Sequence, residues 1–190
     1  MSAIILHGIC DTEEYFEMDF PSPSNAHWLP WLQQKFLRAA YQCQTPEMPA
    51  PYKPDYTSWQ KAFEVFDPAS LRIAVGHSAG AGFLLKYLSS HPDIMLDQLV
   101  LVGAWVDPER KHGDFLLGHY DPGVIDRVGR MHILHSTDDD TDIKKTFQIV
   151  SALYPKATLH IYKDKGHFCE SDLQSRTFPE LWDIIKGPCK

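Results

Sequence analysis

A serine between two glycines is the strongest chemical signal in this chain. The motif Gly76-His77-Ser78-Ala79-Gly80 directly follows the apolar run 71–75 and precedes a stretch of small and apolar residues. A Gly-x-Ser-x-Gly turn between a strand and a helix strains the serine and exposes its hydroxyl at a helix N-terminus. The alternative is a helix N-cap serine beside a glycine turn, which needs neither glycine. We predict that Ser78 is a nucleophile.

A serine nucleophile needs a general base, and the base needs a carboxylate that orients it. With this type of turn, the partners follow in the chain order serine, carboxylate, histidine. The chain has ten histidines, of which His167 alone lies in a loop after the last expected strand. We predict that His167 is the base, the alternative being a surface histidine without a catalytic role.

The carboxylate is expected after the strand-like run 131–135. The loop there reads Ser136-Thr137-Asp138-Asp139-Asp140-Thr141-Asp142. Asp140 or Thr141 is expected to cap the helix that follows. On spacing alone, Asp138 and Asp139 are equivalent candidates for the partner of His167.

The tetrahedral intermediate of acyl transfer needs two N–H donors for its oxyanion. One is expected from Ala79, the residue after the nucleophile. The second is expected from the loop after the first strand, His7-Gly8-Ile9-Cys10, with Ile9 as the donor. The alternative for this loop is an ordinary turn.

These residues have to be positioned by a sheet of parallel strands. Short apolar runs alternate with helix-like stretches, and several runs are apolar throughout, which predicts a parallel sheet covered on both faces. In such sheets the site lies at the carboxyl ends of the strands. The expected strands are 3–6, 41–45, 71–75, 99–102, 131–135 and 158–162, and the expected helices are 28–40, 57–66, 79–89, 143–153 and 173–185. The segment 107–129 is rich in Asp, Gly and Pro and is expected to be a short lid-like insertion.

The composition and net charge of the chain argue against several classes of binding partner. Its 190 residues suit a single domain, and a formal net charge of −7 argues against nucleic acid or an anionic membrane as a partner. No apolar run approaches the length of a membrane span, no signal peptide is evident, and no cysteine pair has metal-site spacing. His132 and His135, three apart on a strand, face opposite sides. We therefore expect a cytoplasmic protein with free thiols, no metal and no cofactor, acting on a small acyl substrate.

Taken together, the motifs resemble the compact α/β hydrolases of the retinoblastoma-binding protein 9 and YdeN-like family. The match includes the strand start 4–8, His27-Trp28-x-x-Trp31, Met48-Pro49-x-Pro51 before Trp59, the serine turn, Ser136-Thr137-Asp138-Asp139 and Gly166-His167-Phe168. Two loops depart from the family pattern. Asp140-Thr141-Asp142-Ile143 lacks the prolines that members carry, and Ile9-Cys10-Asp11-Thr12 replaces a loop rich in Gly and Asn.

The resemblance implies a three-layer α/β-hydrolase fold with a six-stranded, mostly parallel sheet in the order 2-1-3-4-5-6. It also implies a Ser78, Asp139, His167 triad, because the family places the acid at the second Asp after Ser-Thr. The expected function is hydrolysis of a small carboxylic ester through an acyl-enzyme. The alternatives are a non-catalytic binding protein on the same fold and an acyltransferase that uses the same nucleophile.

Overall fold

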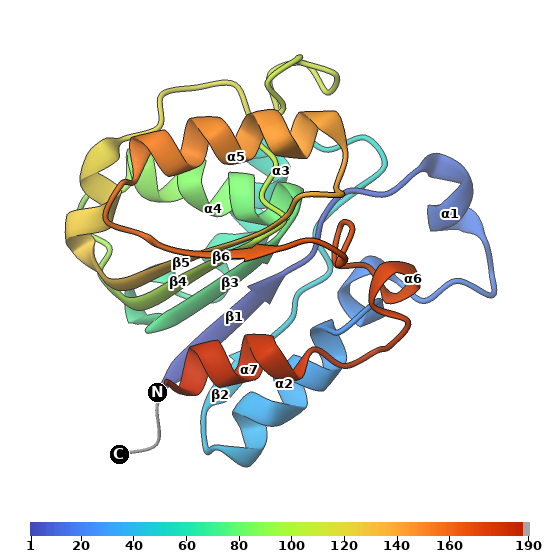
Figure 1. The fold of residues 1–190 in the computed structure, drawn as a ribbon, viewed down its shortest axis with the longest axis horizontal. Coiled ribbons are helices and arrows are strands. Elements are labelled where there is room, and N and C mark those ends of the chain that lie inside the picture. The colour runs from blue at the N-terminus through green and yellow to red at the C-terminus, as the bar shows by residue number, and fades with distance from the viewer. Residues whose placement is uncertain (188–190) are drawn as a thin grey trace.

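The computed structural model describes residues 1–187, in which six strands form one parallel sheet (Figure 1). The strand order is β2-β1-β3-β4-β5-β6, and every neighbouring pair is parallel. The predicted fold class and strand order are thus confirmed. The strands are β1 (Ser2–Leu6), β2 (Gln42–Gln44), β3 (Ile73–His77), β4 (Leu96–Val102), β5 (Val128–Ser136) and β6 (Thr158–Tyr162).

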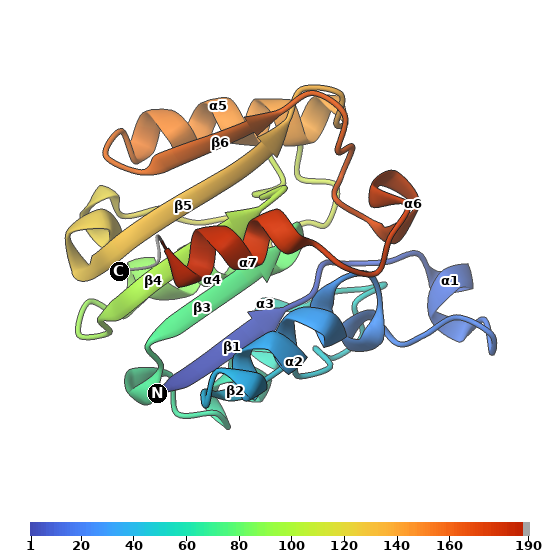
Figure 2. The ribbon, with the colours of Figure 1, turned by 60° about the horizontal axis from the view of Figure 1, so that its bottom comes forward.

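The central strands are apolar throughout because helices bury both faces of the sheet. In β1, Ile4 and Leu6 belong to one buried cluster, whereas Ala3 and Ile5 belong to the other, as the two-residue period of a strand requires. Figures 1 and 2 show α3, α4 and α5 on one face and α2 and α7 on the other. The long helices are α2 (Leu29–Arg38), α3 (Tyr56–Glu64), α4 (Ala79–Ser90), α5 (Thr141–Leu153) and α7 (Pro179–Lys186).

The prediction of one helix over 173–185 is wrong. The short helix α6 (Glu170–Leu173) ends there, and Gln174 turns the chain with a left-handed φ of 48°. The helix α7 then starts at Pro179. Proline removes a hydrogen bond inside a helix but is favoured in the first turn, so Pro179 can begin a helix and cannot continue one.

Other boundaries differ from the sequence-based expectation. The strand β5 starts at Val128, so the last residues of the segment 107–129 are strand, and the 3-10 helix η3 (Pro122–Arg127) precedes them. The lid role of that segment stays a prediction. A short helix, α1 (Thr12–Phe16), follows β1 and was not predicted. It lies away from the sheet, on the same side of the molecule as α6 (Figures 1 and 2).

No helix in residues 1–187 combines the length and the apolar character that crossing a membrane requires. The described cysteines, Cys10, Cys43 and Cys169, are free thiols. Cys189, which we also expect to be a free thiol, lies outside the described residues.

Candidate functional site

Ser78 occupies the turn between β3 and α4 in a strained backbone conformation. Its φ of 53° and ψ of −121° lie in a region that residues other than glycine rarely adopt, at a cost on the order of 1–3 kcal/mol. Backbone hydrogen bonds hold the turn: the Ser78 N–H donates to the Val102 carbonyl at 2.9 Å, and the Trp105 N–H donates to the Ser78 carbonyl at 3.1 Å. The end of β4 therefore keeps the serine in this conformation.

The two glycines of the motif are needed because backbone passes directly against them. A Cβ at Gly76 would lie 2.5 Å from the backbone nitrogen of Ala81, and a Cβ at Gly80 would lie 2.4 Å from the carbonyl oxygen of His7. Real Cβ atoms essentially never make such contacts. The absence of side chains thus lets α4 lie against the ends of β3 and β1.

His167 lies beside a buried carboxylate. Its Nδ1 is 3.0 and 3.1 Å from the two carboxylate oxygens of Asp139, whose side chain is 1% exposed. Asp139 also accepts a hydrogen bond from the Asp140 N–H at 2.7 Å. With Nδ1–H donated to Asp139, the other ring nitrogen of His167 is left without a protein partner in residues 1–187, and it is the nitrogen that a general base uses.

Asp138 has different partners. Its carboxylate accepts hydrogen bonds from the Ser136 hydroxyl and, at 3.1 Å, from the Gly166 N–H. These bonds, chiefly the one from Ser136, lower the pKa of Asp138. Asp138 therefore ties the loop after β5 to the loop that carries His167. The geometry favours Asp139 over Asp138 as the partner of the base, and its catalytic role stays a prediction.

The backbone of His167 is held on both sides. Its N–H donates to the carboxylate of Asp172 at 2.9 Å, and its carbonyl accepts the Nε2–H of His77 at 2.8 Å. The next residue, Phe168, is fully buried and stacks on Phe178. The loop is thus anchored to α6, to the serine turn and to the core.

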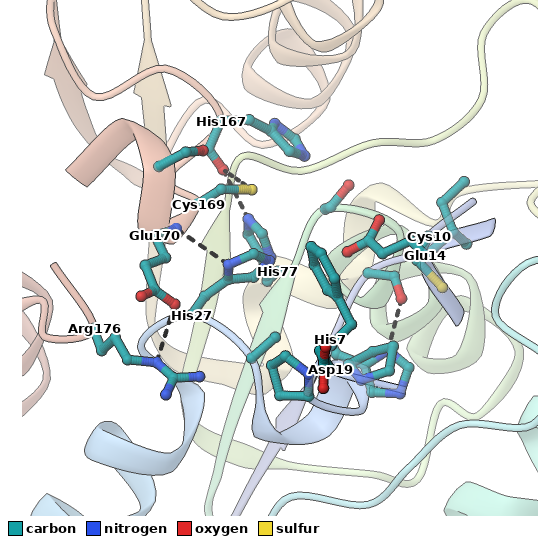
Figure 3. Close-up of a pocket in the computed structure, with 18 residues that line it drawn as sticks. His7, Cys10, Glu14, Asp19, His27, His77, His167, Cys169, Glu170 and Arg176 are labelled. Atoms are coloured by element: carbon teal, nitrogen blue, oxygen red, sulfur yellow. Dashed lines mark hydrogen bonds and ion pairs between the residues drawn. The ribbon is translucent and has the colours of Figure 1, made fainter. Parts of the chain in front are cut away.

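His77 is a site residue to which the sequence analysis gave no role. It is 3% exposed, and burial, followed by the neighbouring His167 and His27, holds its pKa well below the ordinary value of histidine. A neutral His77 that donates from Nε2 to the His167 carbonyl links the turn of Ser78 to the loop of His167 (Figure 3). Its position directly before Ser78 was the available signal.

If His167 is the base, replacing His77 by phenylalanine is expected to lower kcat about tenfold to hundredfold with little change in KM, because His167 loses an anchor and small displacements of a catalytic group are costly. Glutamine can donate to the same carbonyl, so His77→Gln is expected to recover most of kcat. The measurement is steady-state kinetics on an ester that the wild type cleaves, with thermal unfolding to compare stability. Equal kcat in wild type and His77→Phe, or no recovery in a stable His77→Gln, would contradict this role.

The loop after β1 lies against the serine. A Cβ at Gly8 would be 2.9 Å from the Cβ of Ser78, and the Ile9 N–H has no hydrogen-bond partner in residues 1–187. Ala79 is the first residue of α4, so its N–H has no acceptor within the helix. Both predicted oxyanion donors are therefore available, and their role stays a prediction.

His7 fixes this loop as a neutral imidazole. Its Nδ1–H donates to the Gly8 carbonyl at 2.6 Å, and its Nε2 accepts the Met48 N–H at 2.8 Å. Burial lowers the pKa of His7, against the opposing effect of Glu47. Met48 belongs to the proline-rich segment that precedes α3, so this segment supports the loop of Ile9.

Two cavities open on the serine and histidine. The first has a volume of about 710 Å³ and is shown in Figure 3; the second has about 600 Å³. Ile9, Ser78 and His167 line both. The first is otherwise lined by His7, Gly8, Cys10, Glu14, Asp19, Phe20, Pro21, Pro23, Ala26, His27, His77, Cys169, Glu170, Ser171 and Arg176, and the second by Asp11, Trp105, Lys111, His112, Asp140, Thr141, Asp142 and Ile143.

Much of the first cavity comes from residues that sequence reasoning missed. Glu14 lies in α1, and Asp19 and Phe20 lie in the segment between α1 and α2. The available signal was the long stretch from Leu6 to Leu29, which carries no strand pattern. The segment 107–129 contributes Lys111 and His112 to the second of these two cavities.

Within residues 1–187, no group of three or more potential metal ligands is close enough to hold an ion. His132 Nδ1 lies 3.1 Å from His160 Nε2 on the neighbouring strand. The ring of His135 stacks on Phe147 of α5. These two histidines of the same strand thus have separate environments.

Comparisons with known proteins agree with the fold. The structure of the ydeN gene product of B. subtilis matches with a TM-score of 0.78 over 97% of this chain and 96% of that one, at 22% identity. The chain has the α/β-hydrolase fold of YdeN. The resemblance found in the sequence is thereby confirmed at the level of the fold.

Two further structures with a similar fold are more distant. A YdeN-like hydrolase structure from Pectobacterium atrosepticum matches with a TM-score of 0.63 at 16% identity, covering 98% of this chain and 90% of that one. An esterase from Exiguobacterium antarcticum matches with a TM-score of 0.60 at 15% identity, covering 98% and 92%. No protein-family model matches the sequence, and no curated protein is significantly similar to it.

Proposed function

We propose that this protein is a serine hydrolase that cleaves a carboxylic ester through an acyl-enzyme. The observation that carries the proposal is the strained Ser78, which faces the same cavities as His167 while His167 pairs with the buried Asp139. A serine that only caps a helix needs neither the strain nor the histidine. The YdeN-like hydrolase and the esterase that share the fold add support.

In the proposed mechanism, Nε2 of His167 takes the Ser78 proton as the serine oxygen bonds to the acyl carbon. The N–H groups of Ala79 and Ile9 hold the oxyanion. Asp139 accepts the Nδ1–H and stabilises the imidazolium. The acyl–oxygen bond then breaks, and the leaving oxygen takes the proton from His167.

Water completes the cycle by the same route. His167 takes a proton from water, the water oxygen bonds to the acyl carbon, and the bond to Ser78 breaks as the serine regains its proton. The products are one carboxylic acid and one alcohol. An alcohol or amine in place of water would give acyl transfer, which product analysis with competing nucleophiles distinguishes.

A fluorophosphonate probe is expected to label the wild type at Ser78, and Ser78→Ala is expected to abolish labelling entirely, because only an activated serine attacks the phosphorus. Mass spectrometry of the labelled peptide identifies the residue, and circular dichroism shows that the variant is folded. Ser90→Ala, which changes a serine at the far end of α4, is the matched control and should label like the wild type. A folded wild type that resists labelling would overturn the proposal in favour of a binding protein.

A further inference from the structure

The catalytic pair lies where two cavities meet, and this arrangement bears on the size of the substrate. The inference rests on the proposed function. Ile9, Ser78 and His167 line both cavities, whose volumes are about 710 and 600 Å³. Each is of the size that holds a small ligand in other proteins. A scissile bond at Ser78 therefore has a separate space for a group on each of its two sides.

The first cavity has an apolar wall. Phe20, Pro21, Pro23 and Ala26 line it together with Ile9. Its one arginine, Arg176, is paired with Glu170 at 3.0 Å (Figure 3). Glu14 and Asp19 line other parts of the same cavity, and the apolar wall itself suits a hydrocarbon group of the substrate.

The second cavity has a polar and acidic wall. Asp11, Asp140 and Asp142 line it, with Lys111 as its one side chain that is always cationic. Lys111 is engaged by Asp142 and by Glu109. The carboxylates of Asp11 and Asp140 have no ion-pair partner in residues 1–187. An anionic group is repelled here, and a polar group that is neutral or positive is accommodated.

The first cavity has no free positive charge for an anion either. Glu14 and Asp19, which line it, also lack ion pairs within the part of the chain that the structure describes. With Arg176 bound to Glu170, both approaches to Ser78 carry excess negative charge. The charge of the site thus selects against carboxylate and phosphate substrates from either side.

We infer that the substrate is an amphiphilic ester or amide with a substantial group on each side of the scissile bond. Its apolar group occupies the first cavity, and its polar group, neutral or cationic, occupies the second. A short ester fills neither space, so it is a poor substrate of the same catalytic pair.

The test compares kcat/KM for esters that fill neither cavity, one cavity or both cavities. Ethyl acetate fills neither, ethyl hexanoate and acetylcholine each fill one, and hexanoylcholine fills both. The hexyl ester of trimethylglycine reverses the direction of the ester bond and covers the opposite orientation. Its references are hexyl acetate and the ethyl ester of trimethylglycine, which has the same activated carbonyl. For one of these two amphiphilic esters, kcat/KM is expected to exceed that of both of its own singly extended references at least tenfold, because the apolar group is buried in the first cavity and the trimethylammonium group faces the acidic wall of the second.

Two tryptophan variants test the cavities separately. Ser171 and Thr141 are exposed residues at the edges of the first and second cavities. Ser171→Trp is expected to remove the gain from the hexyl or hexanoyl group alone, and Thr141→Trp the gain from the trimethylammonium group alone. Gln148→Trp, on an exposed position of α5 that lines neither cavity, is the control and should keep both gains.

Charge is tested with matched leaving groups. The 3,3-dimethylbutyl ester of hexanoic acid is the neutral analogue of hexanoylcholine and is expected to react within about tenfold of it. A hexanoyl ester that carries a carboxylate at the same position is expected to be at least tenfold slower than the neutral analogue at low ionic strength. This difference should shrink in 0.5 M salt, because salt screens exposed charges within a few ångströms.

The outcomes separate this inference from the proposed function. The inference is overturned if Ser78 is labelled and ethyl esters are cleaved while a second extended group gives no increase in kcat/KM. It is also overturned if one tryptophan variant removes both gains. A carboxylate ester with the same kcat/KM as the neutral ester would overturn it as well. Absence of labelling and of all ester cleavage overturns the proposed function instead. The inference is supported if the two groups each raise kcat/KM, if their effects multiply, and if each effect is lost only in the variant of its own cavity.

Discussion

Replacing Asp139 by asparagine is expected to lower kcat by about four orders of magnitude, as the same change does in a serine protease. The asparagine oxygen can still accept the Asp140 N–H, so the amide would face Nδ1 of His167 with its NH₂ group. Nδ1 of His167 must then accept a hydrogen bond from this NH₂ group, and the proton of the ring moves to Nε2. A histidine protonated at Nε2 cannot take the proton of Ser78.

The matched control for this change is Asp138→Asn. The amide oxygen of the new side chain can still accept hydrogen bonds from the Ser136 hydroxyl and the Gly166 N–H, which are the bonds of Asp138 in the structure. The kcat of this variant is expected to stay within about fivefold of the wild type, since residue 138 does not set the tautomer of His167. The measurement is kcat for ester hydrolysis in both variants. A large loss in Asp138→Asn and a small one in Asp139→Asn would mean that Asp138 is the acid.

The proposed catalytic residues could be identified in the sequence because each lies in a local pattern. The serine turn requires small residues around Ser78, and the proposed acid and base follow consecutive strands at the same edge of the sheet. The choice between Asp138 and Asp139 depends on contacts with residues distant in the sequence. Spacing alone left it open, and the structure distinguishes them by the atoms they contact: Gly166 for Asp138 and the His167 ring for Asp139.

The walls of the cavities were also hard to predict, because they too depend on contacts between residues that are distant in the sequence. The segment from α1 to α2 has no repeating apolar pattern, since it packs on one side of a cavity and faces solvent on the other. Phe16 and Phe20 there are 64% and 53% exposed. The segment is placed by contacts with residues distant in the sequence: the ring of Phe16 packs against Tyr52, and the Glu170 N–H donates to His27. Periodicity carries no information about such contacts.

The interruption of the expected helix 173–185 before α7 could have been predicted from Pro179 alone, and the sequence-based prediction missed it. The apolar pattern of 173–185 fits a helix, but Pro179 cannot lie inside one without loss of a hydrogen bond. The outcome matters for the site because α6 provides Asp172, which accepts the His167 N–H.

Replacing Gly80 by alanine is expected to destabilise the fold by about 3 kcal/mol or more, at the upper end of what overpacking costs. The added methyl group would lie 2.4 Å from the His7 carbonyl oxygen and 2.7 Å from that of Leu6. Both contacts are with backbone at the end of β1, so no side chain can rotate away. The helix α4 and the loop of Ile9 must separate, and the drop in melting temperature is expected to be roughly 6–12 °C.

The matched control is Gly118→Ala, where the added methyl group meets only the flexible side chain of Lys86, at 3.4 Å. Its stability is expected to stay within about 0.5 kcal/mol of the wild type. Thermal and urea unfolding measure both variants, and fluorophosphonate labelling of the folded fraction measures Ser78. Because Gly80 separates the nucleophile's helix from the oxyanion loop, the folded Gly80→Ala protein should also label more slowly. Wild-type stability in Gly80→Ala would mean that α4 can move away from β1 at no cost, and the close approach would then not be what holds Ser78 against Gly8.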